Sequence, residues 1–313
     1  MAINLITRVE PKVMERLYKE SVTQGLFSNQ YSWAGARTIE INSVDNVALT
    51  GYDRTVNDGT AGTIGNRFGS IIELGDTKNA YTVKDEVKYN IGFEKSTNSD
   101  QNDIKTAASI ISRQTREVVT PYLDMYRLRK IALGANEDTT KWGLTKTASG
   151  DLSRSKILET LMKAKAALAN NFAPANQQIL YVGETLAIEM KLADQVIGCD
   201  KIAEQPIVNG VIGKLAGMQL RIVPDKYMNP TTTDLAAAIA NGSLTSGDVG
   251  KELGFLIVSK GCAWAPVKVK TSRVINDHPD FDGTAVQFHM YHDCFVNKLR
   301  NVSVYSGWVS AKT

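Results

Sequence analysis

The sequence has few of the side chains that most often carry catalysis or bind metals. It contains three cysteines and three histidines in 313 residues. Cys199, Cys262 and Cys294 are too far apart for a CxxC motif and too few for a disulfide framework. A nucleophile elbow of the GxSxG type is absent, and no spacing of Ser, His and Asp singles out a catalytic triad. We therefore expect reduced thiols, no metal, no cofactor and no enzymatic activity.

Long apolar runs and a strong charge of either sign are missing too. No stretch of eighteen apolar residues is present, and the first residues lack the basic and then apolar plan of a signal peptide. The chain has 36 basic and 33 acidic residues, and this formal charge of +3 is too small to indicate a surface specialised for binding nucleic acid. We expect no membrane partner, synthesis inside the cell, and only diffuse contact with any nucleic acid.

The dominant pattern is a helical one between Ser99 and Gly134. Ser99 can cap this helix, basic residues precede Gly134, and its length would be on the order of 45 to 50 Å. Its predicted buried face returns every three or four residues and comprises Ile104, Ala108, Ile111, Thr115, Val118, Tyr122 and Met125. Pro121 leaves two interpretations, namely two helices with Thr120 as the second cap, or one kinked helix. The unbroken apolar register favours the kinked helix.

Glycine is concentrated between Thr50 and Gly75, in a segment too long for a tight connection. Gly59, Gly62 and Gly65 match neither common phosphate-binding motif, and no apolar strand leads directly into them. We therefore favour a flexible loop over a phosphate site.

The segment Tyr81–Tyr89 alternates strictly between apolar and polar side chains, which predicts an amphipathic strand. Paired with Phe68–Leu74, it would form a two-stranded ribbon. A ribbon of two strands is marginal in water, and the helix that follows offers too little area to cover it. We infer an arm that packs on a neighbouring subunit, with inter-subunit contacts made by Phe68, Ile71, Ile72, Tyr81, Val83 and Val87.

The other segments alternate between helical and extended patterns. Helices are predicted at Pro11–Val22, from Ser153 through Leu168, at Glu184–Ala193 and at Leu235–Ala240. Strands are predicted at Thr38–Asn42, Ile179–Val182, Ile207–Ile212, Met218–Val223, Phe255–Ser259, Val267–Val274 and Ala285–His292.

Two histidine patterns near the C-terminus could suggest chemistry. His289, His292 and Cys294 have a metal-like spacing, but residues three apart in a strand face opposite sides, so we favour ordinary sheet positions. His278 lies among aspartates that could bind a cation or tune an acid–base group. The same residues are typical of a tight turn, which we favour.

The order of these parts resembles the major capsid protein of tailed bacteriophages, an α+β fold that encapsulin shells also use. An arm with a helix, a ribbon, a long helix, an α/β segment and long returning strands follow one another as in that family. Three local stretches are similar too, namely Leu180–Gly183 with the helix after it, Ile207–Pro224 and Pro279–Val296. The similarity extends along nearly the whole chain and lies in the order of segments rather than in one diagnostic motif.

By position, the resemblance implies five parts. Residues 1–33 would be an N-terminal arm with a short helix, and residues 34–90 an extended β-ribbon loop that lies across the next subunit. Residues 91–136 would belong to a peripheral domain with the long spine helix, and residues 137–265 would form an α/β axial domain. Residues 266–313 would supply the return strands of the peripheral domain and a C-terminal strand.

The resemblance implies a structural role, as a major capsid protein that self-assembles into the icosahedral head shell around the double-stranded DNA of a tailed phage. Its expected partners are other copies of itself in pentamers and hexamers, the portal protein and nonspecifically bound DNA. The fold-like sequence begins within about thirty residues of Met1, so that, if the chain is complete, assembly is expected to depend on a separate scaffolding protein or on none. The expected location is the virion, after assembly in the cytoplasm of the bacterial host.

Flat hexamers and bent pentamers need one sequence to adopt slightly different conformations, and Gly62, Gly65 and Pro121 are the expected flex points. One alternative is an encapsulin-type compartment that encloses a cargo enzyme. Another is a soluble α/β enzyme that binds a phosphate through Gly59–Gly65.

Overall fold

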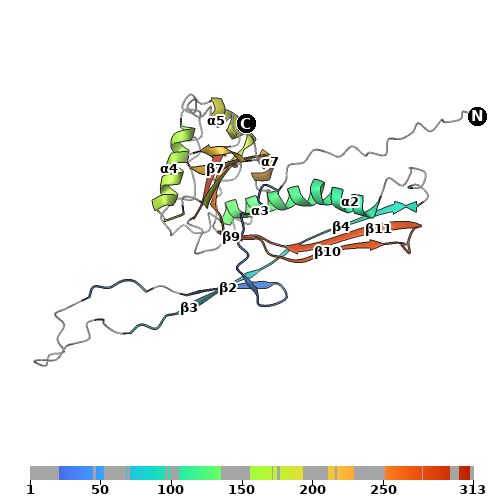
Figure 1. The fold of residues 1–313 in the computed structure, drawn as a ribbon, viewed down its shortest axis with the longest axis horizontal. Coiled ribbons are helices and arrows are strands. Elements are labelled where there is room, and N and C mark those ends of the chain that lie inside the picture. The colour runs from blue at the N-terminus through green and yellow to red at the C-terminus, as the bar shows by residue number, and fades with distance from the viewer. Residues whose placement is uncertain are drawn as a thin grey trace, which may run out of the picture. The chain divides into compact units, whose positions relative to one another are not determined.

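The computed structural model describes residues 21–44, 47–52, 68, 71–95, 98, 106–134, 156–170, 172–174, 177–192, 211–215, 217–228, 251–276, 278–296 and 303–310. The chain forms two compact units. The smaller unit is Gln30–Val83, and the larger combines Met1–Asn29 with Lys84–Thr313. Helices and strands are mixed along the larger unit, which makes the fold an α+β one (Figure 1).

A five-stranded sheet is the centre of the larger unit, with strand order β13-β8-β5-β7-β6. Its strands are β5 (Gln178–Gly183), β6 (Val211–Leu215), β7 (Met218–Val223), β8 (Lys251–Ser259) and β13 (Val304–Ser310). β5 and β7 are parallel and the other pairs antiparallel. The strands predicted in this part of the chain are confirmed where the structure describes them, and the C-terminal strand β13 joins the same sheet.

Both faces of this sheet are covered. All six residues of β5 are buried, and alternate residues enter two different clusters. Leu180 and Val182 pack with helices α4 (Ile157–Asn170) and α5 (Glu184–Leu192), whereas Ile179 and Tyr181 pack with helix α3 (Thr120–Gly134) and helix α7 (Asp225–Met228). β5 is therefore a fully buried central strand, which accounts for its continuous apolar sequence.

A three-stranded antiparallel sheet, of order β10-β11-β4, lies along the same long helix (Figure 1). It consists of β4 (Asp85–Glu94), β10 (Val267–Ile275) and β11 (Gly283–His292), as predicted for the two long return strands. Two short strands, β9 (Ala263–Trp264) and β12 (Phe295–Val296), form a separate antiparallel pair. Val119 of the helix packs on Phe288 and Met290 of β11 and on Val87 of β4.

The long helix passes through Pro121 without a break in the described residues. Helix α2 (Ala107–Gln114) continues into a π-helical turn, η1 (Thr115–Val119), and then into α3. The Thr120 amide and hydroxyl both donate to the Thr115 carbonyl oxygen, the hydroxyl at 2.9 Å. This wider turn lies directly before the proline ring, whose missing donor and bulk an ordinary α-turn accommodates poorly.

Because of the π-turn, the buried face of the helix differs from the predicted one. One extra residue in a turn rotates the following helix by about 100° relative to an ideal α-helix. Val119 is therefore buried, whereas the predicted Val118 is 52% exposed. The predicted Ala108 is also exposed, but it lies before the turn, which does not account for it. The residues that are buried beyond the turn are Asp124, Leu128, Ile131 and Ala132.

The smaller unit contains a three-stranded antiparallel sheet of order β1-β2-β3. Its strands are β1 (Ser32–Trp33), β2 (Thr38–Val44) and β3 (Asp76–Thr82), and Thr38 pairs with Thr82. The predicted pairing of Phe68–Leu74 with Tyr81–Tyr89 is therefore wrong. The Tyr81–Tyr89 pattern spans two strands, because the chain leaves β3 at Val83 and enters β4 at Asp85 without a break in alternation.

Several predicted features lie outside the described residues. These are Ser99 and Ile104 of the long helix, most of the helix Pro11–Val22, the helix Leu235–Ala240, the glycines Gly59, Gly62 and Gly65, and Cys199. Among the helices that the structure describes, none combines the length and the apolar character that crossing a bilayer would need.

Leu128→Ala should lower the free energy of unfolding by about 2–5 kcal/mol, because the side chain is fully buried between α3 and the five-stranded sheet. Val118→Ala, on the exposed side of the same helix, should cost less than about 1 kcal/mol. Urea denaturation of the unassembled chain measures both values. Equal losses for the two variants would contradict the packing of α3 on this sheet.

Candidate interaction surfaces

The smaller unit exposes an unusual amount of apolar surface. Among its described residues, Ile39 and Val83 are the hydrophobic side chains that are fully buried. Eight large hydrophobic side chains are exposed, namely Val44, Val47, Leu49, Tyr52, Phe68, Ile71, Ile72 and Leu74. Burial of each such side chain is worth about 1.5–3 kcal/mol, so a surface of this kind is typical of a site that another protein covers.

The predicted contact residues divide into two groups. Phe68, Ile71 and Ile72 are exposed, at 86%, 100% and 62%, and Phe68 has the Tyr52 ring 5.1 Å away. Val83 is fully buried within its own chain, and Val87 packs against the cluster around Val119. Tyr81, on β3, is partly buried. The contact of Phe68, Ile71 and Ile72 with a neighbouring subunit therefore stays a prediction, whereas Val83 and Val87 contribute to packing within the chain.

A cluster of polar groups fixes the start of β4, directly after the smaller unit ends. The Tyr126 hydroxyl lies within hydrogen-bond distance of Asp85 and of Asp293, the latter at 2.7 Å from Oδ1. Asp293 Oδ2 accepts the Lys84 amide at 3.0 Å, and its Oδ1 accepts the Cys294 amide at 2.7 Å. Burial and the two carboxylates raise the pKa of Tyr126, so its hydroxyl stays protonated and available as the donor.

His292 lies against the same cluster. Its ring is 2% exposed and makes edge-on contacts with Tyr122 and Tyr126, at 5.6 and 4.9 Å between centroids. Burial lowers the pKa of His292, an effect that Arg127 reinforces and that Asp85 and Asp293 oppose. His292 is therefore neutral at physiological pH, and its Nε2 has no hydrogen-bond partner in the described part of the chain.

His289 and His292 lie on opposite sides of β11, as predicted. His289 is exposed, and its Nε2 lies 3.6 Å from Glu86 Oε2. Within the described ranges, no group of three His, Cys, Asp or Glu side chains is arranged to hold a metal ion. Cys262 and Cys294 are both buried and form no disulfide within the described residues, and burial raises the pKa of Cys294.

The predicted turn at His278 connects β10 and β11. His278 Nδ1 accepts the Asp280 amide at 3.2 Å, and the His278 ring stacks on Phe281 at 5.0 Å. The Phe281 ring covers the backbone of Gly92 and Gly283, where an added Cβ would come within 2.7 and 2.4 Å of it. Glycine at these two positions lets the ring close the end of the sheet.

The segment that leads out of the N-terminal arm is held by a buried carboxylate. Asp124 of α3 accepts hydrogen bonds from the Ser21 hydroxyl at 2.8 Å, the Val22 amide at 2.9 Å and the Thr23 hydroxyl at 2.6 Å. The Val22 carbonyl accepts from Tyr181 and Arg221 on the five-stranded sheet. Residues 21–23 are thereby fixed to both the helix and the sheet.

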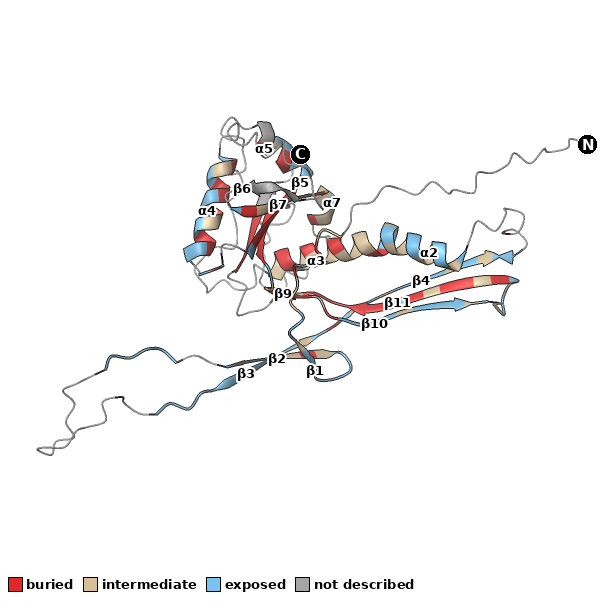
Figure 2. Ribbon diagram, in the orientation of Figure 1, coloured by how far each residue is buried: buried red, intermediate tan, exposed pale blue. Residues whose placement is uncertain are grey.

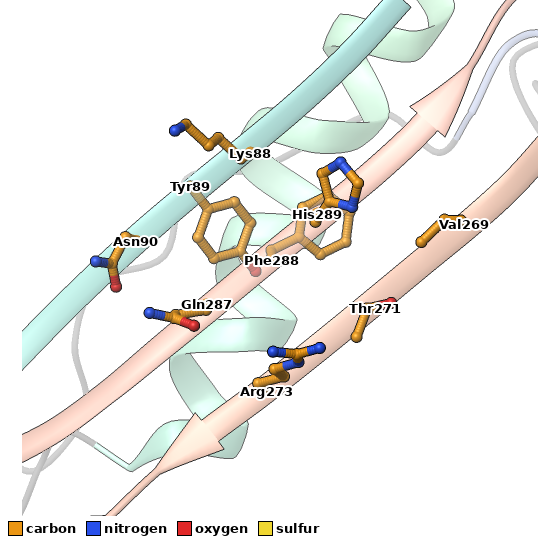
Figure 3. Close-up of a pocket in the computed structure, with 9 residues that line it drawn as sticks. All are labelled: Lys88, Tyr89, Asn90, Val269, Thr271, Arg273, Gln287, Phe288 and His289. Carbon is orange, nitrogen blue, oxygen red and sulfur yellow. The ribbon is translucent and has the colours of Figure 1, made fainter. Parts of the chain in front are cut away.

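The face of the three-stranded sheet that points away from the helix is polar and contains a groove of about 600 Å³ (Figure 3). Tyr89 and Phe288 pair with each other and point toward the helix. Side chains alternate between the two faces along a strand, and directly paired residues share a face, so the residues before and after these two point into the groove. The polar groups that line the groove form two rows across the strands, Lys88–His289–Thr271 and Asn90–Gln287–Arg273. Within the described residues, Lys88, Asn90 and Arg273 make no side-chain hydrogen bond or ion pair.

Solved structures match this arrangement over nearly the whole chain, although no family model and no curated protein matches it. The capsid structure of the cyanophage P-SCSP1u is similar with a TM-score of 0.67 and 14% identity, over 99% of this chain and 94% of that one. The mature capsid of bacteriophage PhiM1 has a TM-score of 0.65 and 13% identity, over 97% of this chain and 92% of that one. The capsid of Helicobacter pylori bacteriophage KHP30 has a TM-score of 0.62 and 11% identity, over 98% of this chain and 95% of that one. The chain has the fold of phage capsid proteins.

Two features of this capsid fold were missed by the sequence interpretation. Asp124 stands between Thr120 and Leu128, four residues from each, and an acidic residue within an apolar helical stripe is a signal of a buried hydrogen-bonding role. The Tyr126 cluster has no comparable signal, because Asp85, Tyr126 and Asp293 are far apart in sequence and meet only through the packing of three elements.

Asp124→Ala should lower the free energy of unfolding by about 3 kcal/mol, because three donors at the N-terminal segment lose their buried acceptor. Asp280→Ala, an 85% exposed aspartate in the β10–β11 turn, should change it by less than about 0.5 kcal/mol. Chemical denaturation of both variants tests this. A loss no greater than that of Asp280→Ala would mean that the anchor of residues 21–23 is not formed.

The depressed pKa of His292 predicts a specific pH dependence of stability. The unfolded chain takes up a proton near the ordinary value of 6.5, whereas the folded chain does so at lower pH. The contribution of His292 is therefore complete above pH 6.5 and is lost as the pH falls toward the folded-state pKa, at up to about 1.4 kcal/mol per pH unit. His292→Phe, which preserves a ring against Tyr122 and Tyr126, should flatten this slope in urea denaturation between pH 7.5 and pH 5.5. The exposed His289→Gln should retain the slope, and equal slopes for the two variants would contradict the assignment.

Proposed function

We propose that this protein is a major capsid protein, which self-assembles into the icosahedral head shell that encloses the double-stranded DNA of a tailed phage. The observation that carries the proposal is the set of eight large hydrophobic side chains, among the described residues of the smaller unit, that the chain leaves exposed within a capsid fold. Eight exposed hydrophobic side chains in one small unit are costly to keep in water, and neighbouring copies in a shell would bury them. The role is structural rather than enzymatic.

The parts of the chain suit the divisions of that fold. The separate unit Gln30–Val83 supports an extended loop close to residues 34–90, although Lys84 and the first residues of β4 belong to the other unit. The long helix with β4, β10 and β11 would form the peripheral domain. The five-stranded sheet would form the axial domain near residues 137–265, with β13 added from the C-terminal part.

The partners follow from this role. Other copies of the chain would form pentamers and hexamers, with a portal protein at one vertex and a separate scaffolding protein during assembly. Packaged DNA would be held by diffuse, nonspecific contacts, since the net charge of +3 is small. Assembly would take place in the cytoplasm of the bacterial host and the product would be the virion.

The proposed flex points between hexamers and pentamers are Gly62, Gly65 and Pro121. The π-turn at Thr115–Val119 supports the last of these, because π-turns occur often at functional sites in helices and this one lies directly before Pro121.

Electron microscopy of the purified full-length chain, co-expressed with its neighbouring genes, tests the proposal. Closed shells or rings of five and six subunits are expected, and a stable monomer or dimer under all conditions would overturn it. Shells that contain DNA and a portal agree with the phage head. Shells that contain a cargo enzyme and no portal would instead identify an encapsulin-type compartment.

Replacing Phe68, Ile71 and Ile72 together by serine should prevent shell formation while the subunit stays folded. These side chains make little contact within the chain, so the urea midpoint should change little, whereas assembly loses about 1.5–3 kcal/mol per buried side chain. A matched control replaces Val118, Met162 and Ile188, exposed hydrophobics of the larger unit, by serine. Negative-stain microscopy and light scattering measure assembly. Normal shells from the first variant would refute a role for this surface.

A further inference from the structure

Phe172, just past the end of helix α4, has an unusual backbone conformation. Its φ angle is 60°, and among the described residues it is the one residue other than glycine with a positive φ. The left-handed region is uncommon for residues other than glycine, asparagine and aspartate, and a bulky side chain there is an outlier. The chain therefore places an aromatic residue where glycine is the usual choice at the end of a helix.

Two backbone hydrogen bonds hold Phe172 in this conformation. The Phe172 amide donates to the Ala169 carbonyl, and the Ala173 amide donates to the Leu168 carbonyl, both at 3.0 Å. This pair of bonds forms a Schellman motif, with Phe172 at its left-handed position. Ala173 is 7% exposed and packs in the cluster between α4 and the five-stranded sheet. Phe172 could leave the left-handed region only by giving up these bonds.

The side chain of Phe172 is exposed as well. Helix α4 buries one face against the five-stranded sheet and leaves its other face in solvent (Figure 2). Phe172 lies beyond this buried face, and at 94% it is the most exposed large hydrophobic residue of the larger unit within the described ranges. An aromatic ring stabilises a protein chiefly through the area that it buries, so this ring contributes little to its own subunit.

Both properties are unfavourable for the isolated subunit. Glycine or asparagine at this position would relieve the backbone and would also remove exposed apolar surface. Residues that a fold keeps in a strained conformation are concentrated at functional sites. The backbone of Phe172 already serves the end of the helix, so the ring is the part of the residue that has no role within the subunit.

Every copy of the chain carries this ring, which narrows the choice of partner. A portal protein at one vertex would meet few copies, and the phosphates of packaged DNA attract cations rather than a phenyl ring. In a shell of identical chains, another copy is available to each subunit. Interfaces between proteins are also where a projecting aromatic ring contributes most, because it can fill a pocket of the partner.

We propose that Phe172 is an anchor between subunits, and that its ring is buried in a second copy of this chain when the shell forms. In rings of five and six subunits, the ring of one copy meets a different surface of the next copy. This inference rests on the proposed function, since it names a residue that holds the copies of the shell together.

Phe172→Gly separates the stability of the subunit from the assembly of the shell. Relief of the left-handed backbone should lower the equilibrium constant of unfolding by about fivefold, which raises the urea midpoint. The subunit concentration needed for shells should rise by at least about tenfold, because each contact loses a buried ring. Light scattering and negative-stain microscopy measure this concentration. Misfolding cannot explain a subunit that is more stable and assembles less readily.

Two further variants control for the flexibility of glycine and for the loss of an exposed apolar side chain. Phe172→Asn keeps a residue that tolerates the left-handed region and should impair assembly as Phe172→Gly does. Met162→Asn removes an exposed hydrophobic side chain from α4 itself and should leave the assembly concentration unchanged. Normal assembly of both Phe172 variants, or an equal loss in Met162→Asn, would overturn the proposal.

Cysteine labelling tests directly whether the position is covered in the shell. Chains with Phe172→Cys are assembled with an excess of the unmodified chain and treated with a small maleimide, and the unmodified chain gives the background. Labelling should be at least about tenfold slower in shells than in free subunits, because the core of an interface excludes water. Protection is expected in shells in which this chain is the only abundant protein.

Equal labelling rates in shells and in free subunits would overturn the anchor. If the unmodified chain forms shells and the rates are equal, the proposed function stands and this inference alone is wrong. If the unmodified chain forms no shells under any condition, the proposed function itself fails.

Discussion

The long helix must pack against two different sheets, and most of the larger unit depends on how it does so. Near its middle, Val119 packs on β11 of the three-stranded sheet, and two turns later Leu128 and Ile131 pack on the five-stranded sheet. A regular α-helix with the spacing of this sequence would direct Val118 inward instead. The π-turn changes the register by one residue, so that one helix presents suitable apolar residues to both sheets. Pro121 follows this turn, two residues after Val119.

Buried polar groups then connect the ends of other segments to this helix. Asp124 holds residues 21–23, and Tyr126 lies between the two carboxylates at the start of β4 and the end of β11. Both side chains come from the first half of α3. Buried polar groups of this kind are costly unless their partners are in place, so they favour one arrangement of the segments that leave the larger unit.

In the smaller unit, by contrast, most of the large hydrophobic side chains are exposed. Among its described residues, two hydrophobic side chains are fully buried and eight large ones are exposed, so its own sheet covers few of them. The edge strand β10 shows the same imbalance for backbone hydrogen bonds. Both surfaces belong to a fold that solved phage capsids share. In the proposed shell, the stability of the subunit and the cohesion of the shell would be carried by different residues.

The sequence by itself determined the helical and extended segments, because side-chain periodicity reports directly on local conformation. It identified β5, β7, β10, β11 and the helices after Ser153 and Gly183, and the opposite placement of His289 and His292. It also indicated that the region around Phe68 and Ile71 lacks cover of its own. Only the tertiary structure decided which strands pair, that Val83 and Val87 face inward, and that Val119 replaces Val118 in the core. Strand partners and helix register depend on contacts between residues far apart in sequence. At the junction of β3 and β4, apolar and polar side chains go on alternating although the chain passes from one sheet to another, so the sequence pattern does not reveal the change.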